Sequence, residues 1–314
     1  MSIGWIYHDD FLRHDTGPMH PERPDRLRAI VRAFEESGLG EQLTRIEPQP
    51  CEPDRLHRIH TPQHVERMEA LCRRAPAVAD AGDTIVSAES YSIALRAVGG
   101  VLAAADAIMA GQFKRIFSTH RPPGHHAERD RAMGFCLFNH IAIAADYLTH
   151  AHHLPRVAVV DFDVHHGNGT QHSFDERADV LFISIHQDPR TLYPGTGFAH
   201  ETGRGAGEGL TLNVPMAPGS GDDDYRGAFD EKIIPKLDEY RPQLLLISAG
   251  FDAMAEDPLA NIELTDRAFD WMTRRLVQVA ERHCESRVLS VLEGGYDLSA
   301  LGRAAIAHAR ALLD

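Results

Sequence analysis

The sequence predicts an α/β protein with three layers (α/β/α), in which a central, mostly parallel sheet lies between two layers of helices. Short runs of continuous apolar, β-branched residues recur along the chain, as strands that are buried on both faces require. Segments with helical periodicity separate these runs, and helical crossovers are what join parallel strands. No linker, internal repeat or low-complexity tract interrupts the alternation, so residues 1–314 are expected to form a single domain.

The elements follow from hydrophobic periodicity. Runs that are too short and too uniformly apolar for surface helices predict strands at 115–120, 156–163, 180–186, 210–215, 243–252 and 287–295. Segments of helical period predict helices at 24–37, 61–74, 87–110, 138–153, 224–240 and 264–283. The Gly/Pro-rich stretch 193–221 is expected to form loops around the strand at 210–215 rather than an interdomain hinge.

The charge balance disfavours nucleic acid as a direct partner. The chain has 46 acidic against 32 basic residues, a formal charge of −14, and contains no block of Lys or Arg. An acidic surface suits cationic partners such as basic peptides or polyamines, although it can equally serve solubility alone.

Cysteine usage and the N-terminus indicate a soluble cytoplasmic protein. Cys51, Cys72, Cys136 and Cys284 lie far apart and form no C-x-x-C pair, which argues against a disulfide framework or a thiolate zinc site. The N-terminus lacks the basic start and apolar run of a signal peptide, and no stretch of about 18 apolar residues is expected to span a membrane.

Polar side chains at the ends of the apolar runs indicate a metal site, because ligands of open parallel sheets bind beyond the carboxyl ends of the strands. Asp161, Asp163 and His165 alternate, so a strand would direct all three to one side. Asp252 ends a second run. Asp163, His165 and Asp252 would form a three-ligand site with an open position, typical of catalytic zinc, with iron as a substitute. The alternative is a hydrogen-bonded network of buried Asp and His without a metal.

Two further groups are expected at the same edge. His125 and His126 follow a Pro-Pro turn after their own strand and are candidate general bases, although such a pair alone is more typical of a surface or a helix cap. Tyr296 follows Gly294-Gly295, which permit a turn that places a phenol over the site; a packed aromatic after a turn is the alternative.

Taken together, these segments resemble the histone deacetylase family, which has the arginase–deacetylase fold, and most closely its class II and bacterial lysine deacetylase branch. The matching segments run in the family's order from residue 20 to 298: HPERPDRLRAI, THRPPGHHAE, MGFCLFNH, DFDVHHGNGT, SIHQ, YPGTG, SAGFDA and LEGGYDL.

This resemblance implies the metal and catalytic roles. The zinc ligands would be Asp163, His165 and Asp252. The paired histidines His125 and His126 would be hydrogen-bonded to Asp161 and Asn168, respectively. His126 is expected to accept the proton of the attacking water and pass it to the leaving lysine amine, and Tyr296 to polarise the acyl carbonyl. Asn168 stands where some relatives carry an acid, which weakens the idea of two equivalent dyads.

The resemblance also implies a structural potassium ion. Its ligands would be the backbone carbonyls of Asp161, Asp163, His165 and Ile185, together with the Ser184 hydroxyl. Ordinary hydrogen bonding at the strand ends is the alternative.

A third implied set would contact the substrate. Its members are Gly134, Phe135, Tyr193, Leu259, Gly294, Gly295 and Asp83. Phe135 and Tyr193 would be the walls of a narrow tube for the acyl-lysine methylenes, and Gly134 would let the chain pass closely. Many relatives carry Phe where Tyr193 stands, which leaves the acyl preference open.

Asp83 is either a rim acid that accepts a substrate amide or a solvated loop acid. Arg26 matches an arginine of an internal product cavity, or is an exposed helix charge.

The implied function is zinc-dependent hydrolysis of N-ε-acetyl-lysine, or of lysine with longer acyl groups, in peptides or proteins. The first alternative is an acetylpolyamine deacetylase, but polyamine-selective relatives carry an acid where this chain has Leu259. A second is a non-catalytic acyl-lysine-binding protein, which would not need all five of the metal and catalytic side chains. A third is a binuclear manganese ureohydrolase, which uses more carboxylates.

Overall fold

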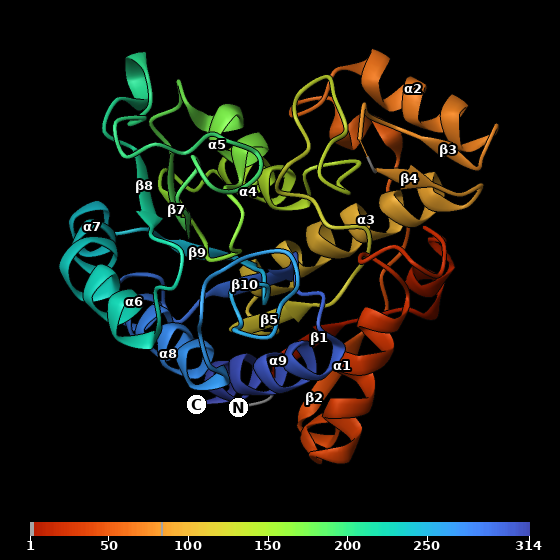
Figure 1. Ribbon diagram of the computed structural model, residues 1–314. Helices are drawn as coiled ribbons and strands as arrows, with labels where there is room; N and C mark the ends of the chain where they lie inside the picture. Colours follow the sequence, from red (N-terminus) through yellow and green to blue (C-terminus); the bar gives the residue numbers. More distant parts are fainter. Residues whose placement is uncertain (1–2, 83) are drawn as a thin grey trace.

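An eight-stranded parallel sheet forms the centre of the computed structural model, which describes residues 3–82 and 84–314 (Figure 1). The strand order is β2-β1-β5-β10-β9-β6-β7-β8, and every pairing in it is parallel. The strands are β1 (Ile3–Ile6), β2 (Leu43–Ile46), β5 (Arg115–Ser118), β6 (Val157–Asp161), β7 (Val180–Gln187), β8 (Thr211–Met216), β9 (Leu244–Ala249) and β10 (Val288–Leu292). A short antiparallel pair, β3 (Ala77–Val78) and β4 (Ile85–Val86), stands apart.

Helices cover both faces of this sheet (Figure 1). One layer contains α1 (Asp25–Glu36), α6 (Asp222–Ala228), α7 (Ile234–Tyr240), α8 (Asp266–His283) and α9 (Leu298–Leu313). The other contains α2 (Pro62–Cys72), α3 (Ser90–Met109), α4 (His140–His150) and α5 (Asn168–Phe174). The predicted three-layer α/β/α architecture is confirmed.

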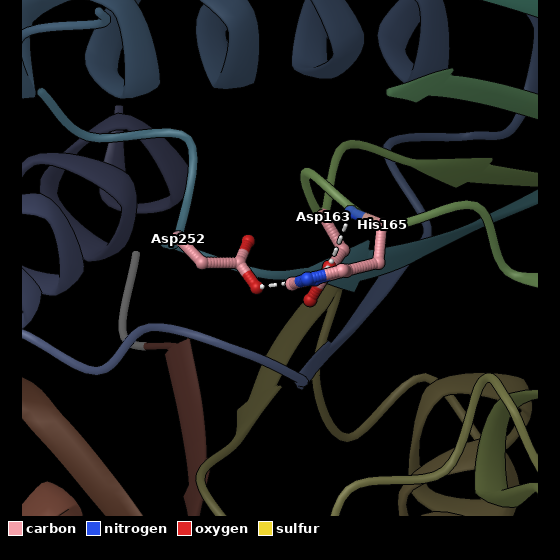
Figure 2. Close-up of side chains that lie close together, drawn as sticks. All are labelled: Asp163, His165 and Asp252. Carbon is pink, nitrogen blue, oxygen red and sulfur yellow. Dashed lines mark hydrogen bonds and ion pairs between the residues drawn. The ribbon is translucent and has the colours of Figure 1, made fainter. Parts of the chain in front are cut away.

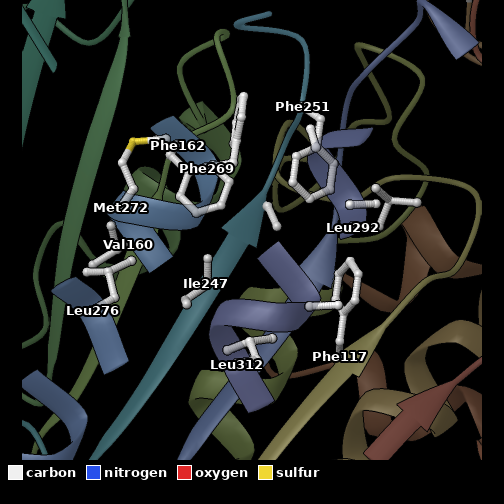
Figure 3. Close-up of a cluster of buried hydrophobic side chains, with 14 of the residues drawn as sticks. Phe117, Val160, Phe162, Ile247, Phe251, Phe269, Met272, Leu276, Leu292 and Leu312 are labelled. Carbon is white, nitrogen blue, oxygen red and sulfur yellow. The ribbon is translucent and has the colours of Figure 1, made fainter. Parts of the chain in front are cut away.

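Two hydrophobic cores result from the alternation of side chains along buried strands. In β6, Val160 belongs to the core under α8 and α9, and Val159 to the core under α3 and α4. Figure 3 shows the first core, where Phe162 lies with its ring centroid 5.8 Å from Phe269 and 6.3 Å from Phe251. Helices therefore shield both faces of the sheet from solvent, and the carboxyl ends of the strands remain as the place where a ligand can bind.

Several element boundaries differ from the prediction. β6 ends at Asp161, so Asp163 and His165 lie in the bend after the strand and not on it. The sequence prediction also omits β1, β2, α5 and α9, although the Ala and Leu content of α9 is typical of a helix. β2 is an edge strand with little burial, which weakens its apolar signal.

The predicted helix at 224–240 contains a change of pitch. A π-helical turn, Phe229–Ile233, separates α6 from α7, and Pro235 in the first turn of α7 lacks the N–H that an α-helical hydrogen bond needs.

The expectation that no segment is long and apolar enough to span a membrane is wrong for α3. This helix passes the test by length and composition, but 67% of its apolar window is buried inside the fold, as in a core helix.

The four cysteines, Cys51, Cys72, Cys136 and Cys284, are free thiols.

Candidate active site

Four loops meet at the carboxyl edge of the central strands. β5, β10, β9 and β6 are consecutive in the sheet, and parallel strands bring the loops that follow them to one edge. The loop after β5 carries His125 and His126, and the bend after β6 carries Asp163 and His165. Asp252 follows β9. The structure thus brings together side chains that are far apart in the sequence.

Asp163, His165 and Asp252 form a compact cluster, with one potential ligand atom of each within 4.8 Å of the others (Figure 2). Nδ1 of His165 lies 3.1 Å from Oδ1 of Asp163 and 3.1 Å from Oδ2 of Asp252. The backbone holds both carboxylates: the N–H of Gly294 donates to Asp163 and that of Val164 donates to Asp252. All three side chains are buried.

The donor set fits a divalent cation. Burial opposes a charged His165, but hydrogen bonds to Asp163 and Asp252 outweigh it and raise the pKa of this imidazole to about 10. The same negative potential favours a dication, and two carboxylates with one imidazole are ligands that zinc or iron accepts. Close packing keeps the space small, because a Cβ on Gly250 would lie 2.1 Å from Oδ2 of Asp163.

The paired histidines make different hydrogen bonds. Nδ1 of His125 lies 2.9 Å from Oδ2 of Asp161, whereas Nδ1 of His126 lies 2.7 Å from Oδ1 of Asn168. The centroids of the two imidazole rings are 4.0 Å apart. One imidazole therefore contacts a carboxylate and the other a neutral amide.

These environments move the two pKa values in opposite directions. Burial disfavours a charged His125, but Asp161, Asp163 and Glu293 outweigh this effect and raise its pKa well above the usual value. Burial and the neighbouring His125 lower the pKa of His126 well below it. A neutral His126 beside a charged His125 can act as a base.

A pocket of about 270 Å³ opens beside the cluster. Its lining residues are Pro21, His126, Gly134, Phe135, His165, Leu192, Tyr193, Leu259 and Tyr296. Pro21 and Leu192 are the two that the sequence did not suggest. Gly134 has φ of 57° and lies against His126, where a Cβ would approach Cδ2 of the imidazole to 2.4 Å, so only glycine fits. The Phe135 ring lies 5.9 Å from that of Tyr296.

Asp257 and Arg26 hold Tyr296 in place. Its N–H donates to Oδ2 of Asp257 at 2.7 Å. The guanidinium of Arg26 lies 4.9 Å over its ring and donates to the carbonyls of Gly295 and Glu293. Arg26 is fully buried, so it is not an exposed helix charge. Burial raises the pKa of the Tyr296 phenol well above its usual value, which keeps the hydroxyl protonated as a donor.

Glu293, which directly follows β10, connects two loops of the site. Its Oε2 accepts hydrogen bonds from the N–H groups of Gly124 and His125, at 2.7 and 3.1 Å. It therefore ties the histidine loop to the Gly294-Gly295 turn.

The remaining predicted residues lie as follows. Asp161 and Ser184 are register partners on β6 and β7, with Ile185 next along β7. Oγ of Ser184 lies 2.8 Å from Nδ1 of His186. Asp83 lies outside the described residues.

A parallel α/β/α fold whose central strand ends present an Asp-His-Asp cluster, a histidine pair and a tyrosine around one pocket defines a metal-dependent hydrolase. The chain belongs to the histone deacetylase family, since residues 20–312 match the model of the histone deacetylase domain. As expected from the sequence, it has the arginase–deacetylase fold and is an enzyme of the amidohydrolase type.

Individual relatives agree with this assignment. The chain is 39% identical over 300 residues to a probable deacetylase of Archaeoglobus fulgidus, a match that covers 95% of this chain and 82% of the relative. It is 41% identical to a histone deacetylase-like amidohydrolase of Pseudomonas aeruginosa, over 88% of this chain and 72% of the relative. The crystal structure of the HDA15 HD domain matches with a TM-score of 0.94 at 36% identity, covering 100% of this chain and 90% of that one.

Proposed function

We propose that this protein hydrolyses the side-chain amide of N-ε-acetyl-lysine, or of lysine with longer acyl groups, in peptides or proteins, and that its metal is zinc. One observation carries the proposal: His165 of the Asp-His-Asp cluster lines the same pocket as His126 and Tyr296. Asp163, His165 and Asp252 would hold the ion. When bound, zinc would polarise the acyl carbonyl and increase the acidity of the attacking water.

His126 would accept the proton of the attacking water. Its Nδ1 faces the oxygen of Asn168, which can only accept, so the ring proton lies on Nδ1 and the lone pair of Nε2 is free. The protonated imidazole would then deliver the proton to the leaving lysine amine. His125, paired with Asp161, would contribute positive charge beside the reaction and keep His126 neutral beforehand.

The Tyr296 hydroxyl would donate a hydrogen bond to the carbonyl oxygen as negative charge develops on it. The backbone of this residue is fixed by Asp257 and its ring by Arg26, so little reorganisation is needed. Gly294 and Gly295 would let this turn approach the reacting group.

The pocket lining favours a peptide substrate over a polyamine. Among the described residues, no carboxylate lines the pocket, and Leu259 stands where an acid would attract a distal ammonium. Phe135 and Tyr193 would shield the lysine methylenes from water, with Gly134 beside them.

The comparison of two substrates on one metal-quantified preparation tests this proposal. We expect kcat/KM for an acetyl-lysine peptide to exceed that for acetylputrescine by at least about tenfold. Preference for acetylputrescine would support the polyamine alternative, and acyl-peptide binding without acetate release would support a binding protein. Metal quantification of the protein as isolated would identify zinc or iron.

We further propose a structural potassium ion near the backbone carbonyls of Asp161, Asp163, His165 and Ile185 and the Ser184 hydroxyl, and a cytoplasmic location. Adjacent strands bring Asp161 and Ser184 side by side. Thermal unfolding in potassium and in tetramethylammonium chloride at equal ionic strength tests the ion, since a specific site predicts a higher Tm in potassium only.

A further inference from the structure

The hydrogen-bond partner of the proposed base is an amide, and an amide can face either way. Asn168 is 2% exposed and begins α5. Its Oδ1 faces Nδ1 of His126, and its Nδ2 donates to Oε1 of Glu128 at 2.5 Å. If this amide were rotated by 180°, its oxygen would face the Glu128 carboxylate, and two acceptors would meet at hydrogen-bonding distance.

Glu128 is itself firmly held. Its side chain is about nine-tenths buried, and its carboxylate lies 2.8 and 3.0 Å from Nδ1 of His172. Asn168 and His172 are four residues apart, on one face of α5, so the helix holds the carboxylate between them. The carbonyl of Glu128 also lies 2.8 Å from Nδ1 of His60. The carboxylate therefore has one position relative to α5.

We propose that Glu128 is a positioning residue that selects the tautomer of His126 through Asn168. Glu128 accepts only, so it requires Nδ2 of Asn168 on its own side. Oδ1 of Asn168 is thereby presented to His126, which places the imidazole proton on Nδ1 and leaves the Nε2 lone pair for the substrate water. The inference rests on the proposed role of His126 as the base, but the tautomer can be observed independently of activity.

Substitutions of Glu128 separate orientation from charge. Glu128→Leu removes the acceptor, and we expect kcat to fall by about 10- to 100-fold, with unchanged metal content and a KM within about twofold. Glu128→Gln retains an oxygen that can accept from Asn168, so most of kcat should remain. Glu176→Leu, an exposed glutamate just after α5, is the control and should behave like the wild type.

Nitrogen-15 NMR of the histidine rings gives the direct readout. His126 should be protonated on Nδ1 in the wild type and in Glu128→Gln, and should become a mixture of tautomers in Glu128→Leu. A Glu128→Leu protein that keeps the Nδ1 tautomer overturns the proposal, as does Glu128→Gln with the same loss as Glu128→Leu. If the tautomer changes as expected but His126→Ala retains activity, the proposed role of His126 fails instead.

A double-mutant cycle provides a second test. Asn168→Asp places a second carboxylate 2.5 Å from Glu128, so it should impair kcat strongly in the wild-type background and much less beside Glu128→Gln. An equal loss in both backgrounds would mean that the two residues are not coupled.

Discussion

At the scale of single residues, buried carboxylates dominate the site. Asp161, Asp163, Asp252 and Glu293 are all at most 1% exposed. Burial raises the pKa of Asp161 to about 6 and that of Glu293 to about 7, so both carboxylates are disfavoured in their charged form. A bound cation would relieve the mutual repulsion of these groups, and the metal and the acids therefore depend on one another.

Loss of an outer hydrogen-bond partner of a metal ligand typically weakens metal binding by roughly 10- to 100-fold. Asp252→Asn should weaken it by more, because this substitution neutralises a ligand itself. The metal content of dialysed protein measures the effect. Asp223→Asn, an exposed acid in α6, is the matched control and should leave the content unchanged. A fully loaded Asp252→Asn protein would remove this residue from the ligand set.

Tyr296→Phe should leave metal content unchanged and lower kcat by about 100- to 1,000-fold, because the variant loses one hydrogen bond to the developing oxyanion. The aromatic ring, and with it the contact to Arg26, is retained. Steady-state kinetics with an acetyl-lysine peptide provide the measurement, with Tyr240→Phe on α7 as the control. Undiminished turnover in Tyr296→Phe would rule out its assigned role.

At the scale of elements, glycines decide how closely the strand ends approach one another. Gly294 follows β10, and a Cβ there would lie 2.0 Å from Oδ2 of Asp252 and 2.7 Å from Oδ2 of Asp163. A side chain at this position would push the turn that carries Tyr296 away from the metal cluster.

Gly294→Ala should therefore lower both the metal content and kcat, even though its backbone hydrogen bond to Asp163 can still form. Gly227→Ala is the matched control, because it lies in α6 with no atom within 4 Å of the added Cβ. It should be neutral or stabilise the protein by up to about 1 kcal/mol. Metal analysis and thermal unfolding of both variants distinguish local displacement from general destabilisation. Normal metal content and turnover in Gly294→Ala would contradict the argument.

The sequence predicts what local patterns encode. Continuous apolar runs locate β5 to β10, and the polar residues after them give the Asp163, His165 and Asp252 cluster, because parallel strands share one edge. The supporting contacts of Arg26 have no such signal, since its carbonyl partner Gly295 is 269 positions away. Glu128 is similarly 40 positions from Asn168 and lies in a loop without periodicity. Such pairings follow from packing and not from spacing.

At the scale of the whole molecule, a buried ionic cluster connects the N-terminal segment to the site. Glu22 is fully buried and forms ion pairs with Arg26 in α1 and with Arg121 in the loop after β5. Arg121 also donates to the carbonyls of Phe11 and His14. Because Arg26 contacts the Tyr296 turn, this cluster joins the loop before α1, the loop after β5 and the end of β10.

Glu22 should make stability depend on pH. Burial alone would raise its pKa, but the guanidinium of Arg121 outweighs burial and lowers the pKa from 4.5 to about 2. A carboxylate with a depressed pKa in the folded state contributes stability above the unfolded pKa. That contribution is lost progressively as the pH falls from about 4.5 towards 2.

Glu22→Gln should therefore destabilise the metal-free protein by about 3–5 kcal/mol at pH 7, because it leaves two buried guanidinium groups without a counter-charge. The difference in free energy of unfolding between the variant and the wild type should shrink as the pH is lowered from 4.5 to 3, because the stabilising contribution of the wild-type carboxylate is lost progressively in this range. Urea unfolding at several pH values measures both effects. Glu36→Gln, an exposed substitution on α1, should stay within about 0.5 kcal/mol of the wild type throughout. Two results would contradict this argument: a Glu22→Gln protein that is as stable as the wild type at pH 7, and a difference in stability that does not change with pH. Either result would show that the cluster does not hold these three segments together electrostatically.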